Sequence, residues 1–341
     1  MKTPKKPINR REFLDRGMRG AGALAVGSAV GAFSGQFAFV AGSETNPFAY
    51  NLDLYTRTDP KLVRYEEVGR FHFAGIEPRR MVWAQEHLYI AAKNGVNVLA
   101  LDGAPISEIS LPAPARCVAV ATDGTIYAGL EDHVEVFDRK GQRQATWDSP
   151  GKKTWFSGLA IGENDIFAAD AGNRVVLRYD KSGKITGRIG EKSTARNVPG
   201  LVLPSPYLDV ELGRDGLLRV NNTGRHCVEL YTRDGDLELS WGKPSAAVEG
   251  FCGCCNPVGL AMLPDGRYVT CEKGLPRVKV YSAEGAFECV VAGPESFPEN
   301  WRKCSLADCT IGGLDVAVDA QGRVSILDFV TGDVHVMRLK A

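Results

Sequence analysis

Cysteine is the residue type with the most chemical potential in this sequence, and its placement is uneven. Five of the nine cysteines fall in two short segments. Cys252, Cys254 and Cys255 lie in the run Gly-Phe-Cys-Gly-Cys-Cys-Asn-Pro, and Cys304 and Cys309 follow further along the chain. Thiol groups that meet can form disulfides or, as thiolates, bind soft metals. The two segments therefore predict one chemically active face, provided that the fold brings them together.

Three kinds of chemistry are open to these cysteines. Disulfides are the leading interpretation, with Cys252 paired to Cys304 or Cys309, because an oxidising compartment preserves such bonds. A metal or iron–sulfur site is the second, since thiolates from two loops can supply four ligands, although Cys-x-Cys-Cys followed by Cys-x4-Cys matches no common ligand spacing. A reducible vicinal disulfide between Cys254 and Cys255 is the third. No cofactor is the leading expectation, with a metal or cluster as the alternative.

A second set of residues combines arginine with aromatic side chains. Guanidinium groups beside aromatic rings can hold an anionic ligand or the acidic loop of a partner protein. A structural role, in which the same side chains fill a central channel, suits them equally well. The members lie at or near the starts of successive apolar strands, and they are Arg79, Arg80, Arg116, Phe156, Tyr207 and Asn256, with Trp155, Asp209 and Asp315 beside them.

These residues recur because the chain repeats a unit of four short strands. The strands are rich in Val, Ile, Leu and Tyr, and Asp-Gly turns and Gly-containing loops separate them. Such a pattern predicts six blades of a propeller, with insertions at 191–206, 243–256 and 294–311. The second strand of each unit begins at Leu88, Ile126, Ile166, Leu218, Tyr268 and Val324.

The most complete unit, residues 158–190, carries Ala-Asp-Ala-Gly-Asn-Arg-Val at 169–175 and closely resembles the NHL repeat. That resemblance implies an all-β, six-bladed β-propeller of the NHL/TolB-like kind. The last unit ends at Leu339 without a fourth strand, whereas residues 61–73 look like a fourth strand without a third. We therefore expect the N-terminal strand to complete the last blade and close the ring. Through Gly-Phe-Cys-Gly-Cys-Cys-Asn-Pro at 250–257, Leu-Pro-Asp-Gly-Arg at 263–267 and Glu-Lys-Gly-Leu-Pro-Arg-Val-Lys-Val at 272–280, the chain also resembles a subfamily of bacterial exported NHL-repeat proteins, which implies no activity.

The first 42 residues differ from the rest in composition. A basic region precedes an Ala/Gly-rich stretch without charges, and Asn-Arg-Arg-Glu-Phe-Leu at 9–14 resembles the twin-arginine (Tat) export signal. We expect residues 1–42 to be this signal, 43–60 a linker and 61–341 the propeller. Such a chain would pass through the Tat translocase to the periplasm. Because no clean small-x-small cleavage site precedes Ser43, an uncleaved signal that tethers the protein to the membrane stays open.

Charge and motif content argue against several function classes. Lys and Arg together number 41, as do Asp and Glu, and removal of the first 42 residues leaves an acidic excess. The basic face that nucleic acid requires is therefore missing. A resemblance to the amidating lyases would imply histidines at the starts of inner strands, but none of the five histidines lies there. A resemblance to lactonase-like propellers would imply a calcium site with a Glu, and no Glu occupies a matching position. We find no Ser-His-Asp order, phosphate loop or paired carboxylates.

These patterns favour a binding protein over an enzyme. We expect an exported scaffold that binds a protein or small-molecule ligand through its cysteine-bearing inter-blade face. The alternative is a cysteine-ligated metal or iron–sulfur protein, including a redox enzyme.

Overall fold

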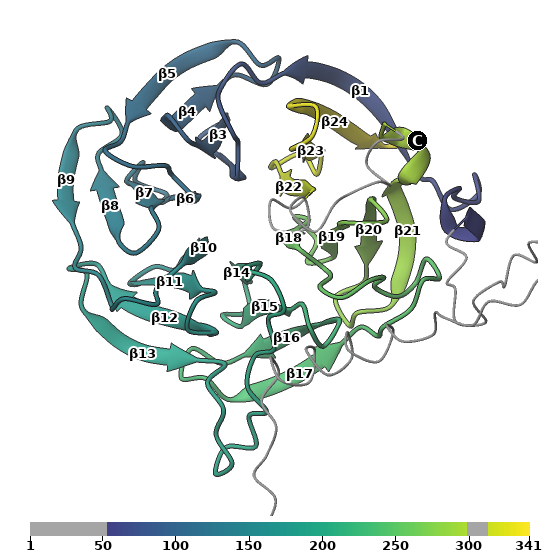
Figure 1. The fold of residues 1–341 in the computed structure, drawn as a ribbon. Coiled ribbons are helices and arrows are strands. Elements are labelled where there is room, and N and C mark those ends of the chain that lie inside the picture. Colours follow the sequence, from purple (N-terminus) through teal and green to yellow (C-terminus); the bar gives the residue numbers. More distant parts are fainter. Residues whose placement is uncertain (1–52, 299–312) are drawn as a thin grey trace, which may run out of the picture. The chain divides into compact units, whose positions relative to one another are not determined.

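The computed structural model describes residues 53–298 and 313–341, which form six four-stranded antiparallel sheets arranged in a ring (Figure 1). The helical elements of these residues are two short 3-10 helices, η1 (Asp53–Tyr55) and η2 (Pro294–Ser296). The predicted all-β, six-bladed β-propeller is confirmed. The expected strand starts also agree closely with the structure, because each unit's second strand begins within one residue of its expected position.

In each blade the strands follow one another from the centre of the ring outward, as Figure 1 shows. Blades one to three contain β2 (Arg80–Ala84), β3 (His87–Ala92), β4 (Gly95–Leu99), β5 (Pro105–Ser110); β6 (Cys117–Val120), β7 (Ile126–Gly129), β8 (Val134–Phe137), β9 (Arg143–Thr146); and β10 (Phe156–Ile161), β11 (Asp165–Asp170), β12 (Val175–Asp180), β13 (Ile185–Ile189). Blades four to six contain β14 (Val210–Leu212), β15 (Leu218–Asn222), β16 (Cys227–Tyr231), β17 (Leu237–Trp241); β18 (Gly259–Met262), β19 (Tyr268–Glu272), β20 (Arg277–Tyr281), β21 (Phe287–Ala292); and β22 (Leu314–Val318), β23 (Val324–Asp328), β24 (Asp333–Leu339) with β1 (Tyr65–His72).

The N-terminal strand closes the ring. Strand β1 pairs antiparallel with β24, from Tyr65 opposite Leu339 to His72 opposite Asp333, and the two lie side by side in Figure 1. The last sheet therefore joins strands from the two ends of the described chain. This pairing covers the outer edge of β24, which would otherwise present unpaired backbone groups to solvent.

Two tryptophans at matching positions pack blades together. Trp147, just after the outer strand β9, stacks on Tyr179 of the next blade with ring centroids 5.0 Å apart. Trp241, which ends the outer strand β17, packs against Tyr268 of the next blade with ring centroids 4.8 Å apart. Each indole covers a glycine in a turn of the neighbouring blade, where an added Cβ would lie 2.4 Å from Trp147 at Gly183 or 2.2 Å from Trp241 at Gly285. Glycine is needed in both turns because the tryptophan fills the space.

Residues 51–341 belong to one compact unit. Residues 53–60, expected to be part of a linker, contact the propeller. The Thr58 backbone N–H and hydroxyl both donate to Glu295 Oε2, and Tyr55 packs against a small cluster of Ala246, Cys252 and Leu275. The expected signal at 1–42 lies outside the described residues, as do Cys304 and Cys309. Within the described ranges, no helix has the length and apolar character to cross a membrane.

Candidate functional site

In blades three to five, the polar residue that ends the second strand fastens the chain segment that enters the same blade. Its side-chain oxygen accepts a hydrogen bond from a backbone N–H of that segment, at 2.8 to 3.1 Å. This repeated contact fixes the links at one end of the channel, where the inner strands begin. The three acceptor and donor pairs are Asp170 with Trp155, Asn222 with Val202, and Glu272 with Cys252.

The fastened links surround a small cavity at this end of the channel, which we call the mouth cavity. Its volume is about 50 Å³, and every blade or the link into it contributes to the lining. Five of the six sequence-predicted ligand-binding residues meet here. The lining residues are Arg79, Arg80, Arg116, Trp155, Phe156, Ser157, Pro206, Tyr207, Val258, Leu314 and Phe329.

Arg116 is the lining residue best placed to receive a ligand. Its guanidinium lies over the Trp155 ring, with Cζ 3.5 Å from the ring centroid, and this stacking holds the guanidinium plane in place. Its Nε is buried and has no hydrogen-bond partner among the described residues. Burial, assisted by the positive charge of Arg79, lowers the pKa of Arg116 from its ordinary value, although Glu131 opposes the shift. Additional negative charge at this point would therefore be stabilising.

The acidic partners of the two outer arginines lie at the exposed rim. Arg116 Nη2 lies 3.3 Å from Glu131, and Arg79 Nη2 lies 3.1 Å from Glu77. The glutamate side chains are 60% and 49% exposed, respectively. Exposed ion pairs of this kind contribute about 0–1 kcal/mol. A ligand can therefore replace either glutamate at little cost in free energy.

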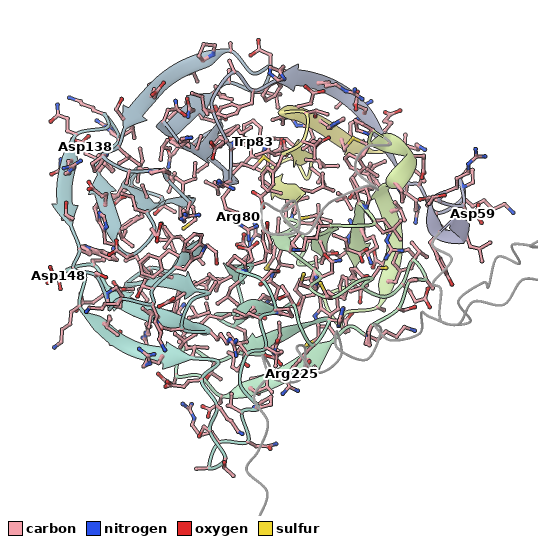
Figure 2. The ribbon with its side chains drawn as sticks, viewed as in Figure 1. Asp59, Arg80, Trp83, Asp138, Asp148 and Arg225 are labelled. Atoms are coloured by element: carbon pink, nitrogen blue, oxygen red, sulfur yellow. The ribbon has the colours of Figure 1, made fainter. Side chains whose placement is uncertain are left out.

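Arg80 has a different environment, because its guanidinium forms hydrogen bonds to four groups of the protein itself. Nη1 lies 2.6 Å from Asp315 and 3.1 Å from Asp209, while Nε and Nη2 donate to the carbonyls of Ser157 and Val258. These four partners belong to blades three to six, so one side chain connects five blades. We call Arg80, Asp209 and Asp315 the central ion cluster; Figure 2 shows Arg80 near the centre of the ring.

The central ion cluster holds more negative than positive groups. Burial lowers the pKa of Arg80, but the charges of Asp209 and Asp315 outweigh burial and raise it. Burial raises the pKa of Asp209 to about 6 and that of Glu211, which is close enough to interact with both aspartates, to about 8. Backbone N–H groups of Met81 and Leu260 donate to Asp315 and Asp209, respectively. These donors stabilise the carboxylates that Arg80 alone cannot neutralise.

Tyr207 and Asn256 are connected through Lys273. Lys273 Nζ lies 4.3 Å from the centroid of the Tyr207 ring and donates to Ser205 Oγ. The Asn256 side chain is 1% exposed; it accepts from the Lys273 N–H at 2.9 Å and donates to the carbonyls of Cys252 and Lys273. Asn256 is thus absent from the cavity lining. It connects the cysteine-bearing link to the wall that carries Tyr207.

The cysteine-bearing link, residues 243–256, rests on a buried ion cluster in blade five. Glu272 accepts from Arg277 Nε at 2.7 Å and lies 2.8 Å from Lys279 Nζ, and the Glu272 and Lys279 side chains are fully buried. Arg277 and Lys279 also donate to the carbonyls of Ala246 and Gly250 in the link. One carboxylate and two cations of blade five thereby fix the position of the link.

The described cysteines lie mostly in the protein interior. Cys252 and Cys255 are 9% and 1% exposed, whereas Cys254 is exposed. The sulfur atoms of Cys254 and Cys255 are 3.2 Å apart, which is a contact and not the bond of about 2.05 Å found in disulfides. Within residues 53–298 and 313–341, no three His, Cys, Asp or Glu side chains are placed to hold a metal. The pairing of Cys252 with Cys304 or Cys309 lies outside the described residues and stays a prediction.

Several members of the site were missed by sequence reasoning. Glu211 lies within strand β14 and Lys273 directly after β19. From the sequence alone, a charged residue at such a position is expected to face solvent. Alignment of the repeats could have drawn attention to Lys273. Its position after Glu272 corresponds to that of Ala171 after Asp170 in blade three. Phe329 follows β23 in the same way and reaches the cavity. For Glu211, no such signal exists, because its burial depends on neighbouring blades.

Comparisons with known proteins establish the fold. No family model and no curated relative match the chain. Similar solved structures include a streptogramin B lyase (16% identity, TM-score 0.56, 81% of this chain and 97% of that one) and virginiamycin B lyase from Staphylococcus aureus (12%, 0.54, 81% and 99%). A Bacteroides thetaiotaomicron protein of unknown function is similar too (14%, 0.53, 80% and 76%). Identities this low carry the fold alone, so the chain is a six-bladed β-propeller protein.

Proposed function

We propose that this chain is an exported β-propeller of the NHL-repeat kind that binds a small molecule through an oxyanion, a carboxylate or a phosphate. The oxyanion binds Arg116 in the mouth cavity, on the face that also carries the cysteine-bearing link. The observation that carries the proposal is the buried Arg116 Nε without a partner, beside Arg79 and stacked on Trp155. A guanidinium held in one plane binds an oxyanion with two parallel hydrogen bonds.

The cost of a buried Arg116 Nε without a hydrogen-bond partner supports this ligand class. A buried donor without a partner costs about 1–3 kcal/mol. An oxyanion that accepts from Nε removes this cost and adds a charge-assisted hydrogen bond, because the arginines are positive in a partly desolvated place. A neutral ligand would remove only part of the cost.

The dimensions and lining of the cavity indicate how the ligand is held. A volume of about 50 Å³ has room for a few water molecules or one oxyanion head group, and it is well below that of a pocket that encloses a drug-sized molecule. The rest of the ligand therefore extends toward the rim. Trp155, Tyr207 and Phe329 line the way out, so an apolar or aromatic body suits the site.

Export is the second part of the proposal and rests on the Tat-like run at residues 9–14. It places the protein in the periplasm or, with an uncleaved signal, at the outer face of the membrane. A metal or iron–sulfur role for the cysteines has no supporting observation among the described residues. The alternative occupant of the mouth cavity is an acidic side chain from a partner protein, which offers the same carboxylate.

Calorimetric titration with three related probes tests the binding proposal. Phenylphosphonate and benzoate present a phosphate-like and a carboxylate head group, and benzamide is a neutral molecule of similar shape. We expect the better anion to bind at least tenfold more tightly than benzamide, because a charge-assisted hydrogen bond contributes about 1.5–3 kcal/mol. Binding of benzamide with equal affinity would contradict the proposal.

Matched variants locate the binding. Arg116→Lys keeps the charge but removes Nε and the planar fork, and we expect it to lose about tenfold in affinity or more. Arg188→Lys is the control, because Arg188 lies on the outer strand β13 and is 44% exposed. Equal losses in the two variants, or no loss in Arg116→Lys, would place the anion elsewhere. If neither anion binds the wild-type protein, the small-molecule proposal fails and the acidic loop of a partner becomes the occupant to test.

A further inference from the structure

Two adjacent cysteines in the cysteine-bearing link have sulfur atoms in contact. Cys254 Sγ and Cys255 Sγ are 3.2 Å apart, so a bond between them requires an approach of about 1 Å. The Cys254 side chain is exposed and that of Cys255 is buried. Neither residue lines the mouth cavity, so this pair is separate from the proposed anion site.

The backbone around the pair is held at several points. The Cys252 N–H donates to Glu272, the Cys252 carbonyl accepts from Asn256, and the Gly253 carbonyl is 2.7 Å from His226 Nε2. Gly253 has φ +82°, a left-handed conformation that glycine adopts without strain. The link therefore presents the two sulfur atoms together before any ligand or reagent arrives.

The other described cysteines are poor competitors for reaction. Burial raises the pKa of Cys117 to about 12 and that of Cys227 to about 11, and it raises the pKa of Cys252 and Cys289 as well. Cys271 is fully buried, and its thiol donates to the Leu314 carbonyl. Because the thiolate is the reactive form and must be reachable, these thiols stay inert. Among the described cysteines, exposed Cys254 is the point of entry.

We propose that Cys254 and Cys255 form a dithiol–disulfide couple that exchanges electrons with small disulfides in the medium. The Cys254 thiolate attacks one sulfur of the small disulfide, forms a mixed disulfide and expels one small thiolate. The Cys255 thiolate then attacks Cys254 Sγ, forms the Cys254–Cys255 bond and expels the second small thiolate. The cysteine pair loses two electrons and two protons, and the small disulfide gains them as two thiols. Cys254 is the attacking residue and Cys255 the resolving residue.

Oxidised glutathione is a suitable probe for the full chain, with intact mass and peptide mapping as readouts. For the wild-type protein we expect a loss of two hydrogen masses and a peptide that contains the Cys254–Cys255 bond. Cys255→Ser should stop at the mixed disulfide and accumulate one glutathione adduct on Cys254. Cys254→Ser should form neither product. Cys289→Ser, a change in the outer strand of blade five, should behave like the wild type.

Phenylarsine oxide provides a second measurement, because trivalent arsenic bridges two neighbouring thiols. We expect one equivalent to bind the reduced protein and both Cys254→Ser and Cys255→Ser to abolish this binding. The proposal is overturned if mapping finds Cys254 or Cys255 bonded to Cys252, Cys304 or Cys309. It is also overturned if Cys255→Ser accumulates no adduct, or if the arsenical binds both variants as well as it binds the wild type.

Discussion

Arg80 Nη1 lies 2.6 Å from Asp315 Oδ1, although the two residues are 235 positions apart in the chain. The pair joins the inner strand of blade one to that of blade six, and Figure 2 shows Arg80 near the centre of the ring. Through Asp209 and two carbonyls, the same guanidinium also reaches blades three to five. The central ion cluster thus does within the channel what β1 does at the periphery, since both fix the closure of the ring.

Arg80→Met should destabilise the protein strongly. The change leaves Asp209 and Asp315 buried without their cation, and loss of one partner of a buried pair typically costs about 3–5 kcal/mol. Urea unfolding monitored by tryptophan fluorescence measures the effect. A triple variant that adds Asp209→Asn and Asp315→Asn should recover part of the loss. An unfolding midpoint equal to that of the wild type would show that the cluster has no role in stability.

Glu211→Gln should stabilise the protein in a pH-dependent way. Burial raises the pKa of Glu211 to about 8 from 4.5, with Asp209 and Asp315 adding to the shift and Arg80 and Arg219 opposing it. The unfolded state therefore releases this proton at lower pH than the folded state, so the free energy of unfolding falls as pH rises between about 4.5 and 8. Glutamine has no proton to release.

The stability difference between Glu211→Gln and the wild type should accordingly be smallest near pH 4.5 and grow to the order of 2 kcal/mol by pH 8. Urea midpoints at a series of pH values give this difference. Asp209, whose pKa burial raises to about 6, stays in both proteins and cancels in the comparison. Parallel pH profiles for the two proteins would contradict the assignment of a raised pKa to Glu211.

Deletion of residues 61–73 should prevent closure of the ring. Strand β1 supplies the outer strand of blade six, and Tyr65, which is 2% exposed, packs into the cluster between blades five and six. Its loss leaves β24 as an open edge. We expect a large fall in the thermal unfolding midpoint and a tendency to aggregate, relative to a chain that begins at Asn51. Equal midpoints would show that the ring is stable without its clasp.

Replacement of Arg10 and Arg11 by lysine should block export. The Tat-like run at residues 9–14 contains the paired arginines that define the signal, and lysine keeps the charge while removing the guanidinium groups. Cell fractionation should find the wild-type protein outside the cytoplasm and the double variant inside it. Replacement of Lys5 and Lys6 by arginine is the matched control. Export of both variants would contradict the signal assignment.

The ring was predictable from sequence because its determinants are local. The strands are short and mostly apolar, many of the turns between them contain Asp-Gly, and the incomplete units at Leu339 and at residues 61–73 leave a single pairing that completes both. The hydrogen bonds that Asp170 and Glu272 accept from the links could not be predicted, because the path of each link depends on the packed blades. Repetition in the sequence specifies where strands start but leaves open what a side chain meets across the channel.

Arg80 and Arg116 illustrate this limit. Both precede or begin inner strands and both line the mouth cavity, but the guanidinium of Arg80 pairs with Asp209 and Asp315, whereas Arg116 Nε has no partner among the described residues. The two residues cannot be separated by residue type or spacing. Only the positions of Asp209 and Asp315 in other blades decide which arginine is available.

A crystal structure of the protein with phenylphosphonate would show whether Arg116 binds the anion. We expect a phosphonate oxygen within hydrogen-bond distance of Arg116 Nε and the phenyl ring beside Trp155 or Phe329. The arginine stacked on Trp155 and the central ion cluster should keep their present positions, because the site is formed before binding. A phosphonate bound at another surface, with Arg116 Nε still lacking a partner, would contradict an anion site in the mouth cavity.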